Sequence, residues 1–168
     1  MKYAKLLGLG ILVAAVAATG CETKTDPTKT PATKAGGEGE HSHGNGPTGG
    51  VTFAVGGEHV ELRVNHDDKT IAICFLQEVK GKKEKEWPAL PVAATEFTLT
   101  TKETMVKEGK DKGKVVPPMT IQLTPKDAKD GKASTFSGTD AGIGNVADFA
   151  GIVFGELAGK PAKGEFKE

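Results

Sequence analysis

The chain has 168 residues, in which 22 lysines and arginines balance 22 aspartates and glutamates, and only 5% of the residues are aromatic. A net charge of zero argues against a nucleic-acid partner, because such proteins usually carry a basic surplus. The 23 glycines follow no G-x-y period, which excludes collagen. No apolar run is long enough to predict a membrane-spanning helix, and the length fits one domain with appendages.

Residues 1–21 indicate export. A basic start, Met1-Lys2-Tyr3-Ala4-Lys5, precedes an uninterrupted apolar run at 6–18 that matches the hydrophobic region of a signal peptide. Ala18-Thr19-Gly20-Cys21 resembles a bacterial lipobox, in which cleavage precedes the cysteine and the cysteine is acylated. We therefore predict a lipoprotein signal peptide at 1–20 and a lipidated, palmitate-bearing Cys21. An ordinary secretory signal peptide with a chance cysteine is the alternative.

Residues 21–50 are predicted to form a disordered linker that starts at the lipidated cysteine. Thr, Lys, Pro and Gly dominate residues 22–50, so this segment cannot bury enough apolar surface to fold. His41 and His43 lie in it and could ligate copper or zinc, because neutral imidazole suits both metals. Two ligands fall short of the usual three or four, so a polar linker that contains histidine is the simpler interpretation.

Residues 51–168 are predicted to form an all-β domain, because apolar and polar side chains alternate there instead of recurring at the helical period. Roughly seven to nine short strands separated by turn residues predict an antiparallel β-sandwich, Ig-like or related, with a small β-barrel as the alternative. Pro117 and Pro118 lack backbone donors, so the strand after them either lies at a sheet edge or starts beyond them. The predicted strands cover 51–55, 59–65, 71–76, 96–101, 119–123, 133–137, 149–157 and 163–167.

The segment 59–65 combines one apolar face with a polar face that we expect to be solvated. His59 and Glu61 share the polar face and could hold a metal or a proton together, although two solvated side chains are the simpler interpretation. His66-Asp67-Asp68 follows and could bind a cation weakly, but aspartates at this position are better explained as turn formers. The candidate metal ligands are thus His41, His43, His59 and His66.

Three further features have both a structural and a functional interpretation. Cys74 lies in the apolar segment 71–76, a predicted central strand, and should behave as a small buried hydrophobic residue without a disulfide partner if Cys21 is acylated. The lysine-rich runs 80–86 and 107–114 could touch anionic lipid or an envelope polymer, but such runs are usually solvated hairpin tips. Trp87 follows the first run, and we expect a core position rather than an interface anchor.

Short motifs around the start of the predicted domain resemble a known family. His41-Ser42-His43-Gly44 and Gly46-Pro47-Thr48-Gly49-Gly50-Val51 are similar to the His-Gly-Pro-x-Gly-Gly motif of small predicted bacterial lipoproteins of uncharacterised function. The same motif resembles the N-terminal region of some heavy-metal efflux adaptor proteins of the membrane-fusion type. The resemblance implies an association with metals, although relatives often have His where this chain has Asn45 or Thr48. Further matches are Glu58–Glu61, Asp68–Ile71, Leu90–Ala94, Glu96–Leu99 and Gly155–Glu168.

The chain lacks the GxSxG, GxGxxG, P-loop, HExxH and EF-hand patterns, so we predict no enzymatic activity, no catalytic residues and no cofactor. The sequence favours an exported lipoprotein, anchored to a bacterial membrane through acylated Cys21 and facing the periplasm or the outside. Its β domain would bind or support an envelope partner. The alternative is a copper- or zinc-binding accessory protein linked to heavy-metal efflux.

Overall fold

The computed structural model describes residues 45–168, so the predicted signal peptide, Cys21, His41 and His43 lie outside the described residues. Along the described chain, the longer strands coincide with segments of alternating or continuous apolar residues, and glycine or aspartate occupies most turns. The elements are β1 (Val51–Val55), β2 (Glu58–Asn65), β3 (Thr70–Leu76), η1 (Glu84–Glu86), β4 (Phe97–Thr101), β5 (Thr104–Met105), β6 (Val115–Val116), β7 (Thr120–Lys126), β8 (Thr135–Thr139), η2 (Ala141–Gly144), β9 (Ala150–Leu157) and β10 (Lys160–Lys167).

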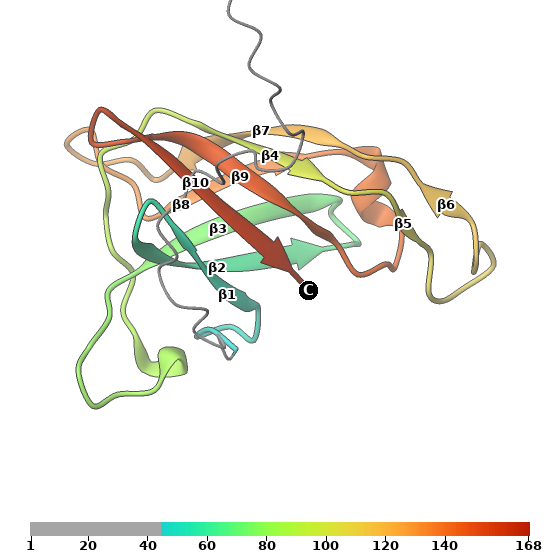
Figure 1. The fold of residues 1–168 in the computed structure, drawn as a ribbon, viewed down its shortest axis with the longest axis horizontal. Coiled ribbons are helices and arrows are strands. Elements are labelled where there is room, and N and C mark those ends of the chain that lie inside the picture. Colours follow the sequence, from blue (N-terminus) through green and yellow to red (C-terminus); the bar gives the residue numbers. More distant parts are fainter. Residues whose placement is uncertain (1–44) are drawn as a thin grey trace, which may run out of the picture. The chain divides into compact units, whose positions relative to one another are not determined.

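Eight of these strands form a single antiparallel sheet in the order β1-β2-β3-β8-β7-β4-β9-β10 (Figure 1). The sheet curls until β10 lies against β1, where the Gly56 amide donates to the Lys163 carbonyl over 3.3 Å. The all-β, antiparallel class is therefore confirmed. Instead of the two separate sheets of a sandwich, the domain has one sheet that nearly closes into a barrel, which was the alternative prediction.

Close packing joins β1 to β10 at this seam. A Cβ atom on Gly164 would lie 2.0 Å from the Ala54 carbonyl oxygen, so the two backbones approach closely only because residue 164 has no side chain. Beside this contact, the rings of Phe53 and Phe166 pack with their centroids 5.7 Å apart. Side-chain packing thus completes a barrel that the hydrogen-bond ladder leaves open.

The barrel interior is filled by the apolar faces of all eight strands. At its centre, the rings of Phe75, Phe97 and Phe136 contact one another with centroid distances of 4.9–5.9 Å, and none of the three is exposed to solvent. Aromatic clusters of this kind stabilise a core beyond the area that they bury. Within the described residues, no helix is long and apolar enough to cross a membrane.

The ends of the strands differ in places from their predicted positions. β7 begins at Thr120, after Pro117 and Pro118, and lies between β8 and β4, so the prolines delay the strand rather than place it at an edge. A short ribbon of β5 and β6 stands apart from the barrel, with Met105 opposite Val115 (Figure 1). The lysine-rich run 107–114 forms the tip of this ribbon, as predicted for a hairpin.

Candidate functional site

Glu61 is fully buried, although the sequence predicts a solvated position for it. Its Oε1 accepts hydrogen bonds from the backbone N–H of Thr48 at 2.8 Å, from the Thr48 hydroxyl at 2.8 Å and from the Gly50 N–H at 3.1 Å. Its Oε2 accepts two more from the Arg63 guanidinium, at 2.9 and 2.7 Å. Burial alone would raise the pKa of Glu61, but the hydrogen bonds from Arg63 and Thr48 outweigh it and lower that pKa.

The loop 45–50 accounts for the burial of Glu61. It folds over the outer face of β2, and a Cβ atom on Gly46 would lie 2.6 Å from the Glu61 carboxyl carbon. The prediction of a solvated polar face was therefore wrong at Glu61, because a neighbouring loop covers it. With five donors already on its two oxygens, the carboxylate is a structural anchor for the loop and is poorly placed to share a metal with His59.

His59 contacts the loop after β3 instead. Its Nε2 lies 3.3 Å from the Glu78 carboxylate, and its ring packs on Trp87 with the centroids 4.6 Å apart. Trp87 is buried against Cys74 and Leu76, which confirms the predictions of a core tryptophan and of a buried cysteine. Cys74 is a free thiol, and no disulfide involves it.

His66 lies at the opposite end of β2 from His59. Its Nδ1 is 2.7 Å from the Ile143 carbonyl, and its ring lies beside Phe149. The strand rises about 20 Å over the six steps from His59 to Asn65, so His59 and His66 cannot bind the same metal ion. Among residues 45–168, no three His, Cys, Asp or Glu side chains come together as a metal site. His41 and His43 lie outside the described residues, so their role stays a prediction.

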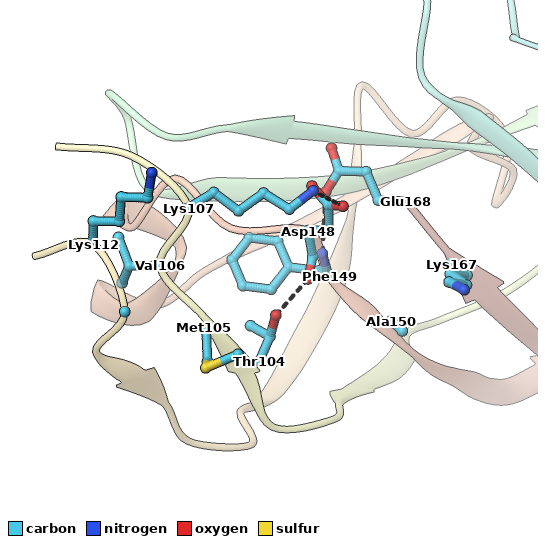
Figure 2. Close-up of a pocket in the computed structure, with 11 residues that line it drawn as sticks. Thr104, Met105, Val106, Lys107, Lys112, Asp148, Phe149, Ala150, Lys167 and Glu168 are labelled. Carbon is cyan, nitrogen blue, oxygen red and sulfur yellow. Dashed lines mark hydrogen bonds and ion pairs between the residues drawn. The ribbon is translucent and has the colours of Figure 1, made fainter.

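A cavity of about 510 Å³ lies between the β5–β6 ribbon and the barrel (Figure 2). The surface that lines it is mostly apolar, with Met105 and Val106 from the ribbon and Phe149 and Ala150 from the start of β9. The other lining residues are Thr104, Lys107, Lys112, Gly113, Asp148, Lys167 and Glu168. Figure 2 shows the Phe149 ring between the residues of the ribbon and those of the chain's last strand.

Polar contacts along its margin hold the ribbon against the barrel and so keep the cavity in shape. The Thr104 hydroxyl donates to the Asp148 carbonyl over 2.8 Å, and the Lys107 N–H donates to the Val146 carbonyl over 2.7 Å. The Lys107 ammonium also pairs with the Asp148 carboxylate, as the dashed line in Figure 2 marks. On the far side, Glu168 and Phe149 exchange backbone and side-chain hydrogen bonds.

Three exposed apolar side chains lie on the ribbon or on the segment bonded to it, and one of them, Met105, lines the cavity. Met105, Val115 and Val146 are 61%, 56% and 42% exposed, and they belong to the ribbon or to the segment hydrogen-bonded to it. Isolated exposed apolar residues need no explanation, but a group beside an apolar cavity is typical of a binding surface.

This cavity could not be predicted from the sequence. Its walls come from residues 104–107, 112–113, 148–150 and 167–168, which are far apart in the chain and meet only after the barrel folds. The lysine-rich run 107–114 was the one available signal, and it was best explained as a hairpin tip. Met105 in a strand of two residues offers too short a pattern to be interpreted.

The described residues form an all-β domain with a small, mostly apolar cavity beside the β5–β6 ribbon. No protein-family model, curated protein or solved structure matches the chain. The resemblance to small lipoproteins and to efflux adaptors therefore stays a prediction.

Proposed function

We propose that the protein is a membrane-tethered, extracytoplasmic lipoprotein whose non-enzymatic β domain binds a small apolar ligand in the cavity beside the β5–β6 ribbon. That cavity is the observation on which the binding role rests. Its volume of about 510 Å³ lies within the range of small-molecule sites, and an apolar lining with a few polar groups is their usual composition.

Three side chains of the described residues that could act in catalysis are engaged elsewhere in the fold, which supports a binding role. Glu61 is saturated by donors, Cys74 is buried, and His66 contacts a backbone carbonyl. A general base or nucleophile must instead reach a reacting atom in a cleft.

The binding role can be tested with N-phenyl-1-naphthylamine, a neutral apolar fluorophore, added to residues 22–168, which contain the whole described domain. Met105→Asp places a charge in the lining at a largely exposed position and should weaken binding about tenfold without unfolding the domain. Phe154→Asp is the matched control, because Phe154 is also 47% exposed but does not line the cavity. Equal binding by both variants would contradict the proposed site.

The anchoring role rests on Cys21 and the apolar run before it. Acyl chains stabilise membrane attachment by about 0.8 kcal/mol per buried methylene, and more than one chain is needed for stable anchoring. Cys21→Ala, or globomycin treatment, should leave a larger, unprocessed form, whereas Cys74→Ala should leave processing unchanged. If mature size and detergent partitioning stay the same in Cys21→Ala, the protein is not a lipoprotein.

A further inference from the structure

We propose that the cavity beside the β5–β6 ribbon selects single-chain amphiphilic anions, with an aliphatic chain against Phe149 and an anionic head at Lys112. This inference rests on the proposed binding function and adds the chemical class of the ligand. It follows from two properties of the same cavity, its apolar wall and the uneven distribution of charge along its margin.

The apolar wall suits an unbranched aliphatic chain. Val106 and Phe149 are almost fully buried and form the deeper part, while the exposed Met105 extends the apolar surface outward from it. Burying a methylene group contributes roughly 0.8 kcal/mol, so even a short chain gains binding energy along such a wall. The flexible Met105 side chain can adapt to chains of different shape.

The charged groups around the cavity are three lysines and two acidic residues. Lys107 is paired with Asp148, and Glu168 accepts a hydrogen bond from the Phe149 amide. Lys112 and Lys167 form no ion pair within the described residues, but Lys167 directly precedes the acidic Glu168 of the same lining, whereas Lys112 has no acidic lining residue next to it in the chain. In the view of Figure 2, Lys112 lies on the opposite side of the Phe149 ring from Asp148 and Glu168.

Charge complementarity therefore favours a carboxylate or phosphate head on the ribbon side of the cavity. A head on the other side would meet Asp148 and Glu168, whose like charges oppose the attraction of Lys167. An amphiphile with its chain along Phe149 and its head toward Lys112 contacts the apolar wall and also places its negative charge beside an unpaired lysine. A neutral amphiphile of the same length makes only the apolar contacts with the wall.

The test compares octanoate with 1-octanol, which differ in the charge of the head. Titration calorimetry on residues 22–168 should show octanoate binding about three- to fivefold more tightly than octanol, the range of one exposed ion pair. Lys112→Gln should remove this difference, while octanol binding stays the same. Lys110→Gln is the matched control, because Lys110 lies in the same turn but does not line the cavity.

The outcomes separate this inference from the binding function itself. Equal binding of octanoate and octanol to the unmodified protein, or equal effects of Lys112→Gln and Lys110→Gln, would overturn the selectivity and leave the pocket intact. No binding of either compound would overturn both. A membrane lipid is the other source of aliphatic anions, and vesicles of anionic phosphatidylglycerol, compared with vesicles of phosphatidylcholine, test it. If the protein binds vesicles through Lys112 but does not bind octanoate, the proposal is also overturned.

Discussion

Thr48 donates both its backbone N–H and its hydroxyl to Oε1 of Glu61, each over 2.8 Å. This pair of hydrogen bonds joins the loop 45–50, where the described chain begins, to the second strand of the barrel. Arg63 completes the arrangement from the other oxygen. The carboxylate thus holds the loop 45–50 on the barrel, and its removal should lower the free energy of unfolding of the domain.

Glu61→Gln should lower the free energy of unfolding by about 1–3 kcal/mol, because the amide turns a donor toward the donors of Arg63 or Thr48 and leaves the partly exposed Arg63 guanidinium without its anion. Urea unfolding followed by circular dichroism measures this loss. Glu58→Gln on the same strand is the control, since Glu58 is partly exposed and forms no ion pair within residues 45–168. Equal midpoints for the two variants would show that the Glu61 contacts contribute nothing.

The lowered pKa of Glu61 predicts how this contribution depends on pH. A carboxylate whose pKa is lower in the folded than in the unfolded chain stabilises the fold above its ordinary value of 4.5, and this stability is lost as the pH falls through the folded-state pKa. The difference in unfolding free energy between the unmodified protein and Glu61→Gln should therefore be constant near pH 7 and shrink below pH 4.5. A difference that grows on acidification would contradict the account.

Gly164→Ala tests the closure of the barrel. Its methyl group would fall 2.0 Å from the Ala54 carbonyl oxygen, so β10 must move away from β1, and we expect a loss of about 2–4 kcal/mol in unfolding free energy. Gly144→Ala is the control, because its methyl group would meet the flexible Lys69 side chain at 3.3 Å and the His66 carbonyl oxygen at 3.6 Å, an ordinary van der Waals distance. Thermal unfolding measures the transition temperature of each variant. Equal transition temperatures for Gly164→Ala and Gly144→Ala would mean that the seam between β1 and β10 is not tightly packed.

The metal-binding alternative makes a separate prediction. His66 contacts the Ile143 carbonyl and lies about 20 Å along the strand from His59, so His66→Ala should leave any zinc or copper affinity unchanged. Isothermal titration of residues 22–168 measures this, and a variant lacking His41 and His43 tests the remaining candidate ligands. Loss of metal binding in His66→Ala would show that the histidines are brought together after all.

Local patterns were enough to predict most of the strands. β1, β2, β3 and β4 lie within a residue or two of their predicted ranges, since each has alternating or continuous apolar residues bounded by turn formers. The packing of β1 against β10 could not be predicted, because the sequence of neither strand indicates which distant strand it contacts. Gly164, where the two backbones meet, looks in the sequence like any other glycine.

The site was less predictable than the fold for the same reason. Glu61 shows the polar alternation of an exposed strand face, and only the loop 45–50 makes it buried. Likewise Met105, Phe149 and Lys112 come from segments that meet only through the tertiary fold. Residue type alone made His59 and His66 candidate ligands of one metal ion, whereas the length of β2 places them at opposite ends of the strand.

The most direct test of the central claim is a titration of ¹⁵N-labelled residues 22–168 with octanoate, followed by NMR. If the cavity beside the ribbon is the binding site, the amides of Val106, Gly113 and Ala150 should shift together and saturate with one dissociation constant, while the amides around Trp87 stay in place. Shifts centred on Trp87, or no saturable shifts at Val106, Gly113 and Ala150, would contradict the account.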